Sequence, residues 1–215
     1  LQRDLGKYKR GRTLLIVGSE KYPGAAYLAL RGAISSGAGF ISAILPDLVA
    51  KSIWQIAPEV VVKGIMMSDQ NGNSCLFDVL KNIDLTFYES VVIGPGIGID
   101  NDDWQNLNSH LLKYEGLLIL DADALNRISQ SKLGQRFFLE RKYKTWITPH
   151  IYEFKRLFPM IDGENSMQLA INAAKEFNIS VLLKGANSIV TDKEKTWQLF
   201  GTDPDTARAG LGDLL

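Results

Sequence analysis

The last residues of the chain combine two chemical features, flexible glycines and an acid. Residues 209–213 read Ala-Gly-Leu-Gly-Asp. Backbone N–H groups at the start of a helix can hold phosphate oxygens, and a carboxylate beside them can take a proton from a substrate hydroxyl. By spacing alone an ordinary helix cap, with Asp213 at the positive end of the helix dipole, is the simpler interpretation. The surrounding motifs must decide between an anion-binding turn and a cap.

A second candidate for anion binding is the segment Lys184-Gly185-Ala186-Asn187-Ser188, directly after an apolar run. It offers an ammonium group, a glycine that allows close approach and a hydroxyl, which together suit a nucleotide phosphate. Its spacing is not that of a Walker loop, and a solvated turn fits the same residues equally well.

The segment Thr148-Pro149-His150-Ile151-Tyr152-Glu153 brings together groups that can bind a ligand. Pro149 ends a strand, and His150 and Glu153 lie three residues apart at the start of a helix, so both can face one pocket. A surface histidine and a first-turn glutamate that complements the helix dipole are the structural alternative. With His110 the only other histidine and Cys75 the only cysteine, the sequence argues against zinc. Magnesium held through Glu153 and substrate phosphates fits better.

Two further segments could contribute to a site. Asp121, Asp123 and Asn126 follow another apolar run. We expect one acid to cap a helix, and the other acid with Asn126 to bind a magnesium-bound water or a ribose. Gly94-Pro95-Gly96-Ile97-Gly98 does not match the dinucleotide fingerprint Gly-x-Gly-x-x-Gly and predicts a tight strand-to-helix connection.

Four of these segments begin where a short apolar run stops. The runs cover residues 91–93, 117–120, 146–147 and 181–183. Continuous Val, Ile and Leu runs are typical of buried parallel strands, and ligands bind beyond the carboxyl ends of such strands. The sequence therefore predicts one shared site and a small-molecule enzyme.

The rest of the chain alternates strands and helices. Predicted strands cover residues 13–17, 40–45, 59–65, 91–93, 117–120 and 145–148, with a hairpin of 188–192 and 196–200 at a sheet edge. Predicted helices begin at Pro23, run from Pro46-Asp47 through Gln55, and cover residues 102–114, 151–158 and 166–177, with one more between residues 120 and 145. Residues 68–74 are expected to form an exposed loop without a functional role. The pattern predicts an α/β fold: a single three-layer, doubly wound domain over residues 1–215 with a mainly parallel sheet.

Composition narrows the class of partner. Lys plus Arg and Asp plus Glu both number 24, so no net charge favours a nucleic acid or an anionic membrane. A single cysteine and no apolar run near 20 residues predict a cytoplasmic protein. Because the chain stops abruptly at Leu215, we expect it to be truncated at its C-terminus.

Taken in order, the motifs resemble those of the ADP/ATP-dependent NAD(P)H-hydrate dehydratase family of the ribokinase-like superfamily. The resemblance runs from about Gly11 to the last residue. The matching segments are Gly18-Ser19, residues 22–26, 36–39, 94–98 and 121–126, Thr148-Pro149-His150 with Glu153-Phe154, Lys184-Gly185 and Gly212-Asp213.

The resemblance implies a lyase that repairs hydrated NADH or NADPH. It uses ATP or ADP, with magnesium, to convert the hydroxyl of the hydrate into a phosphate leaving group before elimination. By the same resemblance Asp213 is the base that activates this hydroxyl, Gly210 and Gly212 lend backbone donors to the transferring phosphoryl group, and Lys184, Gly185, Ala186, Asn187 and Ser188 hold the nucleotide phosphates.

The resemblance also assigns substrate and metal contacts. Ala25, Gly96, Gly98, His150 and Asp213 match positions that contact the hydrated nicotinamide nucleotide. Glu153 matches the acid of the superfamily's magnesium-organising Asn-x-x-Glu element, in which His150 replaces the Asn. The family also includes fusions to an epimerase, which here would lie outside the chain. Neither the oligomeric state, homo-oligomers included, nor the choice between ATP and ADP or between NADH and NADPH follows from the sequence.

Two departures from the family pattern keep other functions open. Arg208 and Leu211 stand where the last family motif has threonines. One alternative is a ribokinase-like small-molecule kinase that phosphorylates a sugar or a vitamin-precursor alcohol, because the fold does not fix the acceptor. Another is a nucleotide-binding protein with weakened catalysis.

Overall fold

The computed structural model describes residues 11–99 and 101–200, and its strands form a single ten-stranded sheet. The strand order is β10-β9-β8-β7-β6-β5-β1-β2-β3-β4. The strands are β1 (Arg12–Ile16), β2 (Phe40–Pro46), β3 (Val61–Ser68), β4 (Ser74–Cys75), β5 (Ser90–Ile93), β6 (Leu117–Leu120), β7 (Thr145–Ile147), β8 (Ser180–Leu183), β9 (Ile189–Thr191) and β10 (Thr196–Gln198). From β8 through β7, β6, β5, β1 and β2 to β3, each strand is parallel to its neighbour. Among the described strands, antiparallel pairs occur only at the two edges, between β3 and β4 at one edge and between β8, β9 and β10 at the other.

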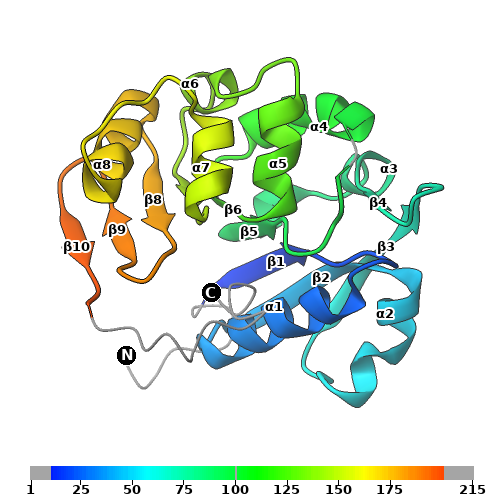
Figure 1. Ribbon diagram of the computed structural model, residues 1–215. Coiled ribbons are helices and arrows are strands. Elements are labelled where there is room, and N and C mark those ends of the chain that lie inside the picture. Colours follow the sequence, from blue (N-terminus) through cyan, green and yellow to red (C-terminus); the bar gives the residue numbers. More distant parts are fainter. Residues whose placement is uncertain (1–10, 100, 201–215) are drawn as a thin grey trace.

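Helices cover both faces of the sheet. They are α1 (Pro23–Ser35), α2 (Asp47–Ser52), α3 (Phe77–Leu80), α4 (Asn101–Lys113), α5 (Asp123–Gln130), α6 (Arg136–Glu140), α7 (Ile151–Leu157) and α8 (Ser166–Phe177), with short 3₁₀ turns η2 (Ile53–Gln55) and η3 (Leu85–Phe87). Figure 1 shows α4, α5, α7 and α8 on one side of the sheet and α1 and α2 on the other. The predicted three-layer, mainly parallel α/β fold is confirmed.

The sheet reverses its direction of growth at one place. From β1 the chain adds β2 and β3 on one side, whereas β5 pairs with the other side of β1 and is followed outward by β6, β7 and β8. At such a topological switch point the turns that follow the two adjacent strands diverge, and a crevice lies between them. Ligands of doubly wound proteins bind in this crevice. In this chain the two turns are the ones after β1 and after β5.

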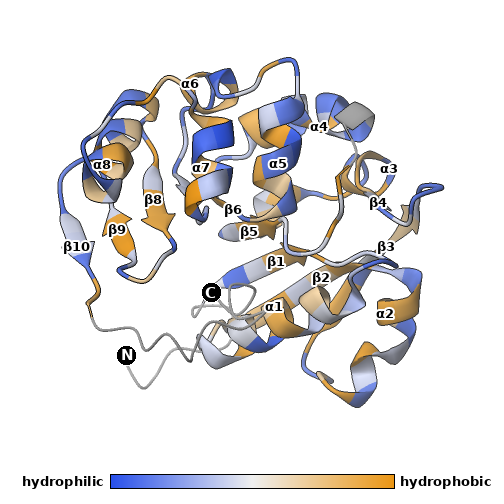
Figure 2. Ribbon diagram, viewed as in Figure 1, coloured by the Kyte–Doolittle hydropathy of each residue, from blue (hydrophilic) through white to orange (hydrophobic). Residues whose placement is uncertain are grey.

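Side-chain alternation along each strand divides the core into two clusters. In β1, Leu14 and Ile16 belong to the larger cluster, under α4 to α8, while Leu15 and Val17, the residue directly after β1, belong to the smaller one, under α1 and α2. Figure 2 shows hydrophobic strands running through the middle of the molecule. On α1, the buried alanines Ala26 and Ala29 face the smaller cluster, and their small side chains let the helix backbone approach the sheet closely.

Most predicted elements agree with the structure to within about three residues, but the interval between β6 and β7 holds two helices, α5 and α6, where we expected one. Residues 68–74 do not form the exposed loop that we expected. Asn73 and Ser74 are buried, and Ser74 begins β4. Its hydroxyl donates to Gly18 O at 2.9 Å, and its backbone N donates to Ile97 O at 2.8 Å. The segment therefore supports the turns at the switch point. In the part of the chain that the structure describes, no helix combines the length and apolar character needed to cross a bilayer.

An ion pair at the opposite end of the sheet allows a test of pH dependence. Glu89, just before β5, accepts from Arg12 N at 2.6 Å and from Arg12 Nε at 3.0 Å. The hydrogen bond from the Arg12 side chain lowers the pKa of Glu89 to about 2. Because half of the Glu89 side chain is exposed, we expect the pair to contribute no more than about 1 kcal/mol.

We therefore predict that Glu89→Gln lowers the free energy of unfolding by up to about 1 kcal/mol near neutral pH. A carboxylate with a depressed folded-state pKa stabilises the protein above its unfolded pKa, and this stabilisation is lost as the pH falls toward the folded value. The difference between wild type and variant in urea unfolding should shrink between about pH 5 and about pH 3. A difference that stays constant over this range would contradict the assigned role.

Candidate active site

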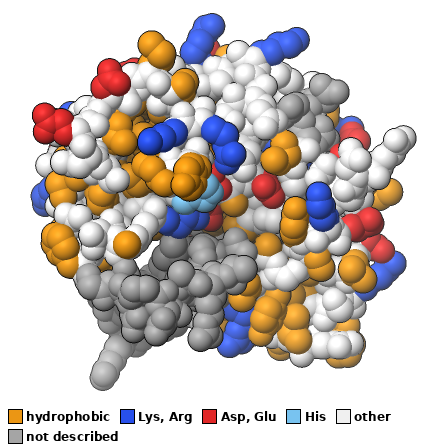
Figure 3. Space-filling model, viewed as in Figure 1, with side chains coloured by type: hydrophobic (Ala, Val, Ile, Leu, Met, Phe, Trp, Pro, Cys, Tyr) orange, Lys and Arg blue, Asp and Glu red, His pale blue; other side chains and the backbone are white. Residues whose placement is uncertain are grey.

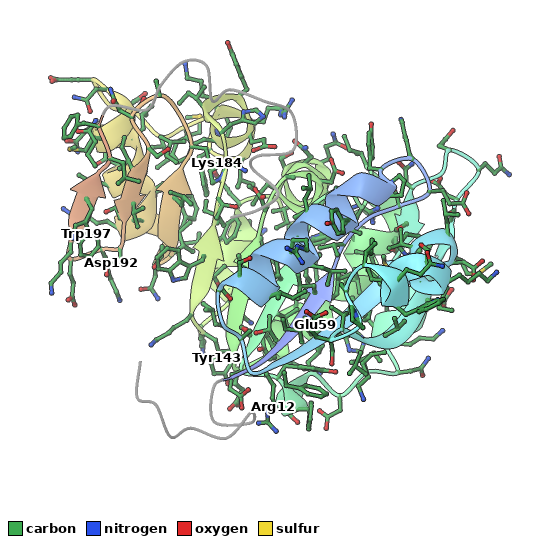
Figure 4. The ribbon with its side chains drawn as sticks, turned by 90° about the horizontal axis from the view of Figure 1, so that it is seen from below. Arg12, Glu59, Tyr143, Lys184, Asp192 and Trp197 are labelled. Carbon is green, nitrogen blue, oxygen red and sulfur yellow. The ribbon has the colours of Figure 1, made fainter. Side chains whose placement is uncertain are left out.

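The turns that follow the parallel strands lie side by side at the carboxyl ends of these strands, as predicted. Backbone hydrogen bonds join each turn to its neighbour: Gly18 N donates to Pro95 O at 2.8 Å, Asp121 N to Ile93 O at 3.1 Å, Thr148 N to Leu120 O at 3.1 Å and Lys184 N to Pro149 O at 2.8 Å. The segments following β1, β5, β6, β7 and β8 therefore form one continuous wall. Figure 4 shows Lys184 on this edge, with Tyr143 and Arg12 at the opposite end of the sheet.

The carboxylate of Asp121, from the turn after β6, holds the Lys184 side chain in place. Its Nζ lies 2.7 Å from Asp121 Oδ1, and the side chains are 18% and 7% exposed. An ammonium group has three N–H donors, of which Asp121 engages one, so the amine keeps donors for an anion. The carboxylate after β6 thus positions the lysine after β8, a pairing across 63 residues that spacing alone did not predict.

A cavity of about 510 Å³ lies beside Lys184. Four of the five residues predicted to hold a nucleotide, Lys184 to Asn187, line it together with Ile151 of α7, Asn165 to Met167 at the start of α8, and Leu183, Ile189 and Gln198. The fifth, Ser188, donates from its hydroxyl to Gly185 O at 3.1 Å and so closes the turn. Figure 3 shows basic and hydrophobic side chains gathered around a histidine on one face of the molecule.

His150 and Glu153 bind each other rather than standing free in a pocket. His150 is the N-cap of α7, and its Nδ1 accepts from Tyr152 N at 3.1 Å and from Glu153 N at 3.3 Å. Glu153 Oε2 accepts from His150 N at 2.9 Å, which completes a capping box. Residue 150 also forms a parallel β-bridge with Lys184, directly after β8, so the predicted substrate and nucleotide residues are adjacent there.

The capping box limits how Glu153 can bind magnesium. The side chain is buried, and its second oxygen, Oε1, lies 3.4 Å from His150 Nε2. Within the described residues, no group of three or more His, Cys, Asp or Glu side chains is placed to hold a metal ion. Mg²⁺ typically keeps several waters and binds through one or two carboxylates plus substrate phosphates. The donor set therefore suits a magnesium ion that would arrive with nucleotide phosphates rather than a preformed protein cage, and Glu153 is the carboxylate that the sequence predicts to hold it.

The interpretation of Asp121, Asp123 and Asn126 needs correction. Neither acid caps a helix through its side chain: the N-cap of α5 is Ala122, at φ 46°, without a side-chain cap. Asp123 Oδ2 accepts from Gly98 N at 2.8 Å, and burial raises the pKa of Asp123. Asn126 Oδ1 accepts from Arg156 Nη2 at 2.9 Å. With Asp121 paired to Lys184, all three side chains have protein partners.

The turn of residues 94–98 depends on its glycines. Gly96 has φ +67°, and a Cβ there would lie 2.5 Å from Ala25 Cβ. The two predicted substrate residues Ala25 and Gly96 are thus in contact, one from α1 and one from the turn after β5. Gly98, at φ +76°, leaves no room for a Cβ, which would lie 2.2 Å from Asn73 Oδ1. Sequence reasoning missed this packing because Asn73 was assigned to an exposed loop.

Comparisons with known proteins agree with this arrangement. A family model described as NAD(P)H-hydrate dehydratase matches residues 13–215. The chain belongs to the NAD(P)H-hydrate dehydratase family. Among curated relatives of this family, the bifunctional NAD(P)H-hydrate repair enzyme Nnr of Synechocystis is 37% identical over 210 residues, which cover 97% of this chain and 38% of that protein.

Two solved structures share the fold of this chain. The ADP/ATP-dependent NAD(P)H-hydrate dehydratase of Bacillus subtilis, co-crystallised with ATP and Mg²⁺, superimposes with a TM-score of 0.80 at 24% identity, covering 100% of this chain and 72% of that one. A ribokinase-like superfamily protein of Enterococcus faecalis gives 0.77 at 24% identity, covering 100% and 71%. The fold is therefore ribokinase-like. The chain spans about two fifths of the length of the bifunctional curated relatives. The predicted residues Gly210, Gly212 and Asp213 lie outside the described residues.

Proposed function

We propose that this chain carries the ATP- or ADP-dependent dehydration of hydrated NADH or NADPH, a hydro-lyase reaction that restores the reduced nicotinamide. One observation carries the proposal: the segments that match the family's motifs meet at the carboxyl ends of the parallel strands, beside the switch point between β1 and β5. There Gly96 contacts Ala25, and Lys184 lies beside a cavity of about 510 Å³. The family supplies the chemistry of the proposal, and the cavity beside Lys184 is a place for the nucleotide.

In this proposal the residues divide into a nucleotide side and a substrate side. Lys184, oriented by Asp121, donates to the nucleotide phosphates, and the backbone of residues 185–188 surrounds them. Ala25, Gly96 and His150 form the wall against the hydrated nicotinamide, and Gly98 belongs to the same turn as Gly96. The bridge between His150 and Lys184 joins the two sides.

The proposed chemistry begins with the hydroxyl of the hydrate, because hydroxide is a poor leaving group. Asp213 takes the hydroxyl proton as the oxygen attacks the terminal phosphoryl group, the bond from that phosphorus to the nucleotide breaks, and Gly210 and Gly212 donate N–H groups to the phosphoryl oxygens. Elimination then breaks the carbon–oxygen bond, expels phosphate and a proton from the neighbouring ring carbon, and forms the carbon–carbon double bond of the reduced nicotinamide. When bound, magnesium neutralises charge on the phosphates.

Glu153→Gln tests the proposed link to magnesium. The amide oxygen can still accept from His150 N, so we expect the free energy of unfolding to stay within about 1 kcal/mol of wild type. The lost negative charge should raise the magnesium concentration for half-maximal turnover at least about threefold. An unchanged magnesium requirement would remove Glu153 from this role and leave it as a helix cap.

The function itself is tested with the whole protein, hydrated NADH or NADPH, magnesium, and either ATP or ADP. Recovery of reduced-nicotinamide absorbance together with phosphate release would establish the repair reaction and identify the phosphoryl donor. Release of a stable phosphoester from an alcohol, without that recovery, would instead support a small-molecule kinase, which the ribokinase-like fold also allows. In the whole protein we further propose that a hydrate epimerase accompanies this unit, since several relatives, among them that of Synechocystis, are named bifunctional.

A further inference from the structure

We infer that Asp123 and Arg127 are positioning residues that hold the Gly94–Gly98 turn in its substrate-binding shape. This inference rests on the proposed function for the identity of the substrate. Neither side chain was assigned this role from the sequence, where Asp123 was expected to cap a helix or to bind water or ribose. The structure gives the pair a different role, as a clamp on the backbone of the turn.

The clamp acts on both backbone groups of one residue. Asp123 and Arg127 are four residues apart on α5, so they share one face of the helix. Asp123 Oδ2 accepts from Gly98 N at 2.8 Å, and Arg127 Nε donates to Gly98 O at 2.7 Å. Gly98 is therefore fixed at its N–H and at its C=O by side chains from consecutive turns of one helix.

Arg127 extends the clamp to a second segment. Its Nη2 donates to Ile97 O at 3.0 Å and to Ser74 O at 2.8 Å, and its Nη1 lies 3.6 Å from Asp103 Oδ2. The side chain is completely buried. A buried guanidinium that bonds three carbonyl oxygens from two segments fixes the distance between those segments, here the turn after β5 and the start of β4.

The remaining bonds of the turn leave Gly96 free. Gly94 O accepts from Ile97 N, Pro95 O accepts from Gly18 N, and Ile97 O accepts from Ser74 N. Of residues 94–98, only Gly96 has an N–H and a C=O without a hydrogen bond to any part of the chain that the structure describes. Gly96 is half-buried and in the left-handed region, so the clamp presents the backbone of one residue to a ligand.

Gly98 thereby receives a different role from Gly96. It is buried and both of its polar backbone groups are engaged, whereas the resemblance placed both glycines in contact with the substrate. In this arrangement Gly98 is the anchor and Gly96 the contact. Loss of the anchor should weaken binding of the nicotinamide nucleotide and leave the adenine nucleotide site around Lys184 unaffected.

The chain contains a matched control. Arg141 is also buried, and its guanidinium also donates to carbonyl oxygens of other segments, including Gly116 O at 2.8 Å and Tyr114 O at 2.5 Å. It lies at the amino ends of β6 and β7, away from the site. Arg127→Met and Arg141→Met each remove one buried guanidinium of this kind, so their effects on stability should be similar.

The experiment compares these variants in the whole protein for steady-state kinetics and for adenine nucleotide affinity. Arg127→Met should raise KM for the hydrated dinucleotide at least about tenfold, with nucleotide affinity within about twofold of wild type, whereas Arg141→Met should change neither. Asp123→Ala should raise KM similarly. Asp123→Asn keeps an oxygen acceptor for Gly98 N and should stay within about threefold of wild type.

Amide exchange at Gly98 provides a readout that does not depend on catalysis. Protection should be present in wild type and in Arg141→Met and lost in Asp123→Ala and Arg127→Met. Protection that persists in both clamp variants, or KM values equal to those of Arg141→Met, would overturn the inference. A wild-type protein without dehydratase turnover would instead count against the proposed function, and Gly98 exchange would still decide whether the clamp exists.

Discussion

Asp213→Asn is expected to reduce turnover at least about 100-fold while adenine nucleotide affinity stays within about twofold of wild type. Asparagine has nearly the size of aspartate but cannot accept the proton of the substrate hydroxyl as a carboxylate does. The backbone donors proposed at Gly210 and Gly212 are unchanged by the substitution, so phosphate binding should be retained. Single-turnover phosphate release and calorimetric titration with the nucleotide measure the two quantities separately.

Asp205→Asn is the control for this variant, since it removes one carboxylate from the same terminal segment without a proposed role in catalysis. It should turn over at nearly the wild-type rate. If Asp213→Asn did the same, Asp213 would not be the base. If both variants lost nucleotide binding, the segment would act through its overall charge rather than through one carboxylate.

The second large effect is expected at Lys184. Lys184→Met should weaken nucleotide binding at least about tenfold, because an ammonium group directed at phosphate oxygens is replaced by a thioether. The same change leaves Asp121 buried without its cation, so the free energy of unfolding should fall by about 3 kcal/mol. Urea unfolding and nucleotide titration measure these two losses.

The double variant Asp121→Asn/Lys184→Met separates the two roles of the lysine. Neutralising Asp121 removes the uncompensated buried charge, so at least about half of the lost stability should return. Nucleotide affinity should remain as weak as in the single variant. If affinity recovered together with stability, Lys184 would only maintain the structure, and the assignment of residues 184–188 to the nucleotide would be wrong.

Local patterns in the sequence, such as apolar runs and prolines, correctly predicted individual strands and helix starts. Continuous apolar runs identified strands such as Leu117–Leu120, and the proline at residue 23 marked the start of α1. Because neighbouring parallel strands have their carboxyl ends on the same side of the sheet, these runs also predicted that the turns after them would lie close together. The hairpin of β9 and β10 followed from its polar turn between short apolar stretches.

Partners that are far apart in the sequence could not be predicted in the same way. Arg127 carries no local sign that it is buried, because its bonds go to carbonyl groups of residues 74, 97 and 98. Asp123 looks like a helix cap in its own segment, and only the fold brings Gly98 to it. Asn73 and Ser74 appear in a polar, glycine-containing stretch that is typical of exposed turns, yet they pack against two other turns. The spacing of residues within one segment allows several roles for each residue, and the tertiary contacts of the fold determine which role it has.

The pairing of β1 with β5 also bears on how the protein forms during synthesis. Thr13 and Ser90 are 77 residues apart, a larger separation than that of any other neighbouring strand pair among the described residues. At about 5–20 residues per second, a ribosome needs about 4–15 s to add that stretch. For this interval β1 is a hydrophobic strand with one open edge, which is a template for pairing with other chains. The β1–β5 junction beside the crevice therefore has the longest delay between the synthesis of its two strands, and until β5 is available this side of β1 is an exposed edge.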